Sequence, residues 1–357
     1  MTYFSFNKGK FINKGKILLG GYAVASTHKT ELTSAEISNL WMSFQNDSMA
    51  ICAIRHFLAH CDDDDIRGIL EFSLAISKLH IKKVTELFLS EGYPLPIGYT
   101  DKDVNLEAPR LFTDKLYLLY MMNMGKFGLS SYSLALSLVA REDIVEYYTN
   151  CLDETKKLHN DAKKVALEKG ILLRPPLIPK HDTVDFVKKG NFKTGYFGNR
   201  RPLLGIEIAN LHYNAERNAL GLAVIIGFSQ VAKEKDVRKY FERGRNISQK
   251  HLEVFNSLLG EEYLNGVLPQ AQEVTDSTIP PFSDKLMMYH VSALTASAIG
   301  QYGIAMSSSP RHDLGIIYER LKMEIVHLSD DGADIMIDHG WLEQPPMNSN
   351  RKALAKE

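Results

Sequence analysis

The stretch Glu36-Ile-Ser-Asn-Leu-Trp41 occurs a second time as Glu207-Ile-Ala-Asn-Leu-His212, at an offset of 171 residues. At the same offset, Ser77-Lys-Leu-His80 returns as Ser248-Gln-Lys-His251. Further along, Glu154 meets Glu324 at an offset of 170. An offset that slips by a single residue between distant segments indicates that the chain contains an internal duplication.

The two copies also end alike, at Gly170-Ile-Leu-Leu-Arg-Pro-Pro176 and Gly340-Trp-Leu-Glu-Gln-Pro-Pro346. A chain of 357 residues is too long for one ordinary core, so two domains are expected. We predict an N-terminal arm over 1–29, a first domain over 30–173, a linker over 174–202, a second domain over 203–346 and a C-terminal tail over 347–357.

Each copy has the pattern of four helices. In the second copy, apolar or small residues recur at helical spacing through 204–226, and further helices are predicted over 235–259, 282–306 and 312–339. In the first copy the predicted helices cover 33–60, 63–91, 112–139 and 141–169. No segment shows sustained alternation with β-branched residues, so the fold class is all-α with almost no sheet.

The connections between the predicted helices are short, long and short in each copy. The long ones, Gly92–Pro109 and Gly260–Pro281, contain several Pro and Gly residues. This connectivity is that of ferritin-like bundles, which use one long crossover. We therefore expect two tandem ferritin-like four-helix bundles, each with one long crossover between its second and third helices.

The composition excludes several classes of protein. A net charge of −1 argues against general affinity for nucleic acid or for an anionic membrane surface. No stretch approaches the roughly 20 apolar residues of a membrane span. The three cysteines, Cys52, Cys61 and Cys151, lack metal-ligand spacing, and we expect free thiols in a reducing compartment. Lysines around a short, glycine-interrupted apolar run in residues 8–21 favour a basic arm over a secretion signal, hence a cytoplasmic protein.

Six polar residues of the second copy share helical faces with apolar residues. They are His212 and Glu216 on the first predicted helix, His251 on the second, His290 on the third, and Glu324 and His327 on the fourth. Burying two carboxylates and four imidazoles in a bundle costs free energy unless something pairs with them. A divalent metal supplies that pairing, so we predict a metal centre in this core. A metal-free polar network is the alternative.

The charges of these six residues indicate the type of centre. Two carboxylates balance one divalent ion, which favours a mononuclear site. A dinuclear site with an additional anionic bridge remains open. Mixed imidazole and carboxylate ligands suit iron, zinc, manganese or nickel. Six candidate ligands exceed the four of a closed zinc site, so iron is our first choice.

The first copy is expected to be metal-free. Its equivalent positions hold Trp41, Gln45, His80, Tyr120, Glu154 and Lys157. Lys157 is expected to neutralise Glu154, and the two aromatic rings are expected to fill the remaining volume. The other histidines are expected in loops or on the surface; they are His28, His56, His60, His181, His312 and His339.

With these repeats, the chain resembles the ferritin-like superfamily. It is more closely similar to a tandem-repeat family of unknown function from Bacillus-type spore formers, and to coat-F-type spore proteins. The resemblance implies a di-iron site, for which Glu216, His251, Glu324 and His327 match. Ser248 and His290 stand where the family pattern has Glu.

Two functions follow from this pattern. The first is a ferritin-like metal-binding protein, in which an enzymatic role would be that of a metal-dependent oxidoreductase with an undefined small-molecule substrate. The alternative is a metal-free structural or spore-associated interaction protein with a vestigial polar core. We expect no nucleic-acid partner and no membrane span. A homodimer and an intrachain pseudo-dimer of the two copies both remain open.

Overall fold

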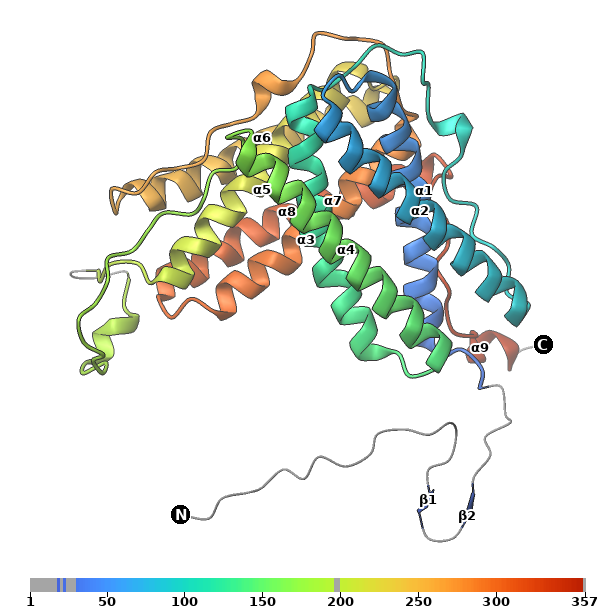
Figure 1. Cartoon of the computed structure of the whole chain (residues 1–357), viewed down its shortest axis with the longest axis horizontal. Coiled ribbons are helices and arrows are strands. Elements are labelled where there is room, and N and C mark those ends of the chain that lie inside the picture. The colour runs from blue at the N-terminus through green and yellow to red at the C-terminus, as the bar shows by residue number, and fades with distance from the viewer. Residues whose placement is uncertain (1–17, 20–21, 24–29, 196–199, 356–357) are drawn as a thin grey trace.

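The computed structural model describes residues 18–19, 22–23, 30–195 and 200–355, and its long helices form two successive sets of four (Figure 1). The first half contains α1 (Ser34–His60), α2 (Asp64–Glu91), α3 (Asp114–Leu138) and α4 (Glu142–Glu168). The second half contains α5 (Gly205–Val231), α6 (Lys235–Gly260), α7 (Asp284–Ser307) and α8 (His312–Asp338). Apart from a longer α5, these bounds follow the predicted ranges closely. The all-α class and the tandem repeat are confirmed.

The remaining described elements are short. They are the 3₁₀ turns η1 (Asp101–Asp103), η2 (Gly190–Lys193) and η3 (Ala271–Glu273), helix α9 (Arg351–Leu354), and the antiparallel strands β1 (Leu18–Leu19) and β2 (Tyr22–Ala23). The rest of the predicted basic arm, with His28, lies outside the described residues. Within the described ranges, no helix is both long and apolar enough to cross a membrane.

The repeated Glu-Ile-x-Asn-Leu stretch begins the first helix of each half, and its glutamate explains why it recurs. Glu36 accepts a hydrogen bond from the backbone N–H of Thr33 at 2.8 Å and another from that of Arg141 at 2.9 Å. Glu207 accepts equivalent bonds from Leu204 at 2.8 Å and Arg311 at 3.4 Å. Each glutamate therefore caps its own helix and ties it to the start of the fourth helix, satisfying backbone donors that a helix leaves unpaired.

Within each half the helices pack as two hairpins, α1–α2 with α3–α4, and α5–α6 with α7–α8. The two halves meet at a common apex and diverge from it like the arms of an inverted V (Figure 1). The first crossover (residues 92–113, joining α2 to α3) and the second crossover (residues 261–283, joining α6 to α7) lie against each other at this apex.

The two crossovers pair through antiparallel backbone bridges. Val104 pairs with Phe282, and Phe112 pairs with Val274. The two valines occupy equivalent positions in the repeats, as do the two phenylalanines, so exchanging the halves converts one bridge into the other. This is the reciprocal pattern of an isologous contact between identical subunits, here formed within one chain.

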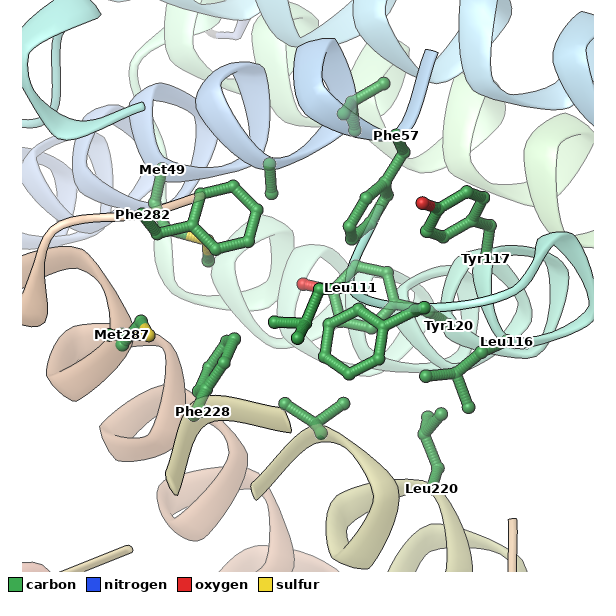
Figure 2. Close-up of a cluster of buried hydrophobic side chains, with 14 of the residues drawn as sticks. Met49, Phe57, Leu111, Leu116, Tyr117, Tyr120, Leu220, Phe228, Phe282 and Met287 are labelled. Atoms are coloured by element: carbon green, nitrogen blue, oxygen red, sulfur yellow. The ribbon is translucent and has the colours of Figure 1, made fainter. Parts of the chain in front are cut away.

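The largest hydrophobic core is shared between the halves. Figure 2 shows Phe57 and Tyr117 of the first half, the crossover residues Leu111 and Phe282, and Phe228 of α5 converging on one cluster. Two smaller clusters lie further out, one in each half. Since removal of apolar surface from water is the main stabilising contribution to folding, neither half is expected to keep its core when separated from the other.

The segments that follow the fourth helices add to this contact. Glu343, after α8, accepts hydrogen bonds from the Gln45 side chain at 2.5 Å and from the Ile97 N–H at 2.7 Å, both in the first half. After α4, Ile171 and Leu172 pack against the shared core. Contacts between the halves therefore form at several places along the chain.

One expectation about the histidines is wrong. His56, expected on the surface, is 1% exposed, and its Nε2 lies 3.2 Å from the Ala108 carbonyl oxygen. Its ring lies edge-on to that of Phe282, with the ring centroids 5.4 Å apart. The apolar pattern of α1 alone does not show that the second crossover covers this face.

Gly227 of α5 offers a test of the contact between the halves. A Cβ atom at Gly227 would lie 2.5 Å from the Phe112 ring, whereas one at Gly221 of the same helix would meet nothing closer than 3.9 Å. We expect Gly227→Ala to lower the free energy of unfolding by about 1–3 kcal/mol through overpacking. Gly221→Ala, the matched control, should raise it by up to about 1 kcal/mol through helix propensity. Urea unfolding followed by circular dichroism measures both, and equal effects would contradict the tight contact.

Candidate functional site

His80 of α2 lies inside the first half between two carboxylates. Its Nδ1 is 3.2 Å from Asp47 Oδ2 of α1, and its Nε2 is 2.9 Å from Glu154 Oε2 of α4. The imidazole is only 3% exposed. Burial alone would lower the pKa of His80, but the charge of Asp47 and the hydrogen bonds to both carboxylates raise it to about 12. His80 is therefore an imidazolium held by two anions.

His251 occupies the equivalent place in the second half, but one of its two hydrogen-bond partners differs. Its Nε2 lies 3.3 Å from Glu324 Oε2, which repeats the contact between His80 and Glu154. Its Nδ1 instead meets the Tyr302 hydroxyl at 3.1 Å, and that hydroxyl accepts from Asn218 Nδ2 at 2.8 Å. Burial lowers the pKa of His251 to about 4, so this imidazole is neutral.

The difference between the two histidines comes from one position of the repeat. Asp47 and Asn218 are equivalent residues at an offset of 171. The carboxylate of Asp47 favours a charged imidazole, whereas the neutral amide of Asn218 gives no such charge. The two equivalent sites therefore differ in charge, with an imidazolium in the first half and a neutral imidazole in the second.

Of the remaining predicted ligands, Glu216 pairs with the other half of the chain. Its Oε2 lies 3.0 Å from Lys126 Nζ of α3, and its Oε1 lies 3.5 Å from His212 Nε2. Burial raises the pKa of Glu216, but the contacts with His212 and Lys126 outweigh it and hold that pKa below its usual range. Glu216 is thus already neutralised by an ammonium group.

His290 of α7 lies where the two halves meet. Its Nε2 is 2.8 Å from the hydroxyl of Tyr120, the residue at the equivalent position of the first half. Burial lowers the pKa of His290 to about 4. Within the described part of the chain, its Nδ1 has no hydrogen-bond partner. His290 therefore joins the halves and keeps one ring nitrogen unpaired.

His327 departs from the expectation that all six residues face the interior. It is exposed on α8, although Glu324 three residues earlier reaches His251. A spacing of three residues places two side chains on neighbouring parts of a helix surface, and here the boundary between buried and exposed positions runs between them. The expectation of an inward His327 is wrong.

The structure separates the six residues into local contacts. His212 lies with Glu216, His251 with Glu324, and His290 with Tyr120 of the first half. Glu324 also pairs with Lys250, at 2.6 Å. Across residues 18–19, 22–23, 30–195 and 200–355, no group of three or more His, Cys, Asp or Glu side chains is placed to hold a metal ion. The six residues do not fit a single metal centre in this arrangement.

The first copy also differs from its prediction in one contact. Lys157 pairs with Asp161 and lies 4.5 Å above the Phe72 ring, so it does not neutralise Glu154. His80 makes that contact instead. Asp47 is not among the residues predicted from the sequence, because it lies outside the six aligned positions. The difference between Asp47 and Asn218 is nevertheless visible in the aligned repeats.

A comparison with known proteins bears on the duplication. A family model described as "Protein of unknown function (DUF3231)" matches residues 23–184 and again residues 191–354. No curated protein matches the chain. Among solved structures, a "putative spore coat protein" from Bacillus halodurans C-125 is 21% identical, over 42% of this chain and 98% of that chain, with a TM-score of 0.39. The double match to one family model agrees with the repeat found in the sequence.

The two histidines are expected to differ in a nuclear magnetic resonance titration. Near pH 7, the ring ¹⁵N shifts of His80 should be those of an imidazolium and those of His251 those of a neutral ring, since only His80 has a buried carboxylate at Nδ1. Asp47→Asn should lower the pKa of His80, and the reciprocal Asn218→Asp should raise that of His251. Two unperturbed titrations near pH 6.5 would contradict this assignment.

The same shifts give stability opposite dependences on pH. The contribution of protonated His80 is complete below its unfolded pKa of about 6.5 and is lost as pH rises toward its raised folded value. For His251, stability is lost as pH falls from about 6.5 through its lowered folded value, because the unfolded chain then binds a proton that the folded chain does not. Urea midpoints across pH for the wild type and Asp47→Asn measure the first effect.

Proposed function

Because this chain belongs to the family of proteins of unknown function called DUF3231, we propose its role from its own contacts. It is a structural protein in which a metal-free polar core locks two helical repeats into one unit. The role corresponds to the second of the two functions that the sequence predicts. Its core residues are retained for the contacts they make with one another.

The ion pair between Lys126 and Glu216 carries this proposal. It joins α3 of the first half to α5 of the second at 3.0 Å. Neither charge has an equivalent in the other copy. The residue equivalent to Lys126 is Ala296, and the residue equivalent to Glu216 is Gln45. Glu216, which the sequence pattern predicts as a metal ligand, therefore pairs with a lysine of the other repeat. Displacing that ammonium by a metal ion would leave Lys126 without its partner.

Other polar contacts support the same role. Tyr120 and His290 join equivalent positions across the two halves. Where the crossovers pair, Thr113 donates to Glu273 at 2.6 Å and Ser283 donates to Asp103 at 2.8 Å. These two hydroxyl groups cap α3 and α7. The contacts between the halves thus begin at the helix starts and continue into the core.

We also propose that each half is a ferritin-like bundle. The support is its connectivity, in which two helical hairpins are joined by one long crossover. The association with spores that the sequence resemblance implies stays a prediction, as does the metal-dependent oxidoreductase role of the first function. Immunodetection in spore and cytoplasmic fractions of the source organism would distinguish the two locations.

A double-mutant cycle tests the lock between the halves. Lys126→Met and Glu216→Gln should show a coupling energy of about 1–2 kcal/mol in urea unfolding, because both side chains are largely buried. The matched control is the exposed pair of Lys157 and Asp161, whose coupling should stay below about 0.5 kcal/mol. A coupling for Lys126 and Glu216 no greater than the control would contradict the proposed lock.

Metal content and histidine replacement test the absence of a metal. Protein purified without added metal should contain less than about 0.2 equivalents of any transition metal, and EDTA should leave its melting temperature unchanged. His251→Leu with His327→Leu should change the free energy of unfolding by no more than about 1 kcal/mol, since a buried polar group is replaced by an apolar one. The single variant His327→Leu is the exposed control. Stoichiometric iron, lost in the double variant together with stability, would overturn the proposal.

A further inference from the structure

An internal cavity of about 110 Å³ lies within the first half, closed on one side by α7 of the second half. All four helices of the first half contribute to its wall. The wall is mainly apolar and includes Ile54, Ile76, Met121, Met124, Phe127 and Leu158. Concave apolar sites of this kind, with a few polar groups, are where proteins hold small molecules.

Several polar side chains complete the cavity wall, and three of them bear on binding. Asp47 and His80 contribute the ion pair described above, and His290 contributes the ring whose Nδ1 has no partner among the described residues. His290 is 3% exposed, with its Nε2 occupied by Tyr120. A buried polar atom without a hydrogen bond destabilises a protein unless water or a ligand meets it.

The second half has a smaller version of the same cavity. It measures about 60 Å³ and is lined by Asn218, Ser248 and His251, the counterparts of Asp47, Ser77 and His80. Several other equivalent lining residues differ in size. Gly128 and Thr155 line the first cavity where Ala298 and Ile325 line the second. Gly128 and Thr155 are the smaller members of these two pairs, whereas Met121 is larger than its counterpart Val291, and only the first cavity has the charged pair.

The cavity lies directly behind an outer groove. His80 lines both the cavity and a groove of about 380 Å³ between α2 and α4, which Glu154 and Cys151 also line. The contact between His80 and Glu154 thus forms part of the wall between the cavity and the outside. Glu154 is about one quarter exposed, so this pair reaches the surface of the groove.

The geometry points to a binding site in this cavity for a small uncharged molecule with a single ring and one hydroxyl group, such as a phenol. The volume limits the ligand to a single ring at most, since it is below the roughly 150 Å³ of an apolar cavity that holds benzene. A hydroxyl both donates and accepts, so it satisfies the carboxylate of Asp47 or the unpaired Nδ1 of His290 in either tautomer. A carboxylate ligand would meet the carboxylate of Asp47 and is disfavoured.

A titration of the full-length protein with phenol, toluene and benzoate tests the site. Phenol should shift the methyl resonances of Met121 and Met124 saturably, toluene should bind more weakly, and benzoate should leave them unchanged. The exposed Met42 and Met347 report non-specific effects. Binding of benzoate as tight as that of phenol, or no phenol-dependent shift at Met121 and Met124, would overturn the assignment.

The variant Thr155→Ile places the second-half residue in the first cavity. It should weaken phenol binding by about tenfold or more, as an added methylene in a fitted pocket does. Ile325→Thr, the reciprocal change, should leave the affinity unchanged. Unaltered affinity in folded Thr155→Ile would place phenol elsewhere and overturn the proposal. If that variant fails to fold, nuclear Overhauser effects from phenol to the Met121 and Met124 methyl groups in the wild type decide, and their absence is equally contradictory.

Discussion

The antiparallel pairing of the two long crossovers is the constraint on which the rest of the structure depends. A crossover that leaves a helical hairpin carries backbone donors and acceptors that need partners once buried. Here each crossover supplies them to the other, through Asn105 N–H to Pro281 O at 2.8 Å and Thr275 N–H to Leu111 O at 3.0 Å. The crossover residues Leu111 and Phe282 belong to the shared hydrophobic core (Figure 2). The two repeats therefore fold as one body, although each has its own set of four helices.

The contact between the halves gives some polar residues partners in the other copy, although the repeat pattern predicts partners in their own copy. Where the two halves meet, Tyr120 contacts His290 instead of a partner in its own half, and Lys126 pairs with Glu216. The histidine–glutamate pairs His80–Glu154 and His251–Glu324 instead stay within their own halves and are preserved between the copies.

The two preserved pairs show how little is needed to differentiate a duplicated site. Replacement of one carboxylate by an amide, Asp47 against Asn218, separates an imidazolium from a neutral imidazole. Smaller residues at two lining positions accompany the charge in the first half and leave room around it. The copy that had lost most of the predicted ligands is therefore the copy with the larger internal cavity. A repeat that lacks the predicted metal ligands can therefore carry a different kind of site.

The sequence by itself determined the duplication, the eight long helices and the long crossovers, because helical periodicity and chain stops are local properties. It also indicated that His251 and Glu324 face one core, and that the repeat preserves both in His80 and Glu154. Periodicity shows that a helix face is buried but not which surface covers it. Only the tertiary structure brought Lys126 to Glu216, placed His327 outside and buried His56 beneath Phe282. The two contacts join residues that are 90 or more positions apart in the chain, and no spacing within a single helix encodes them.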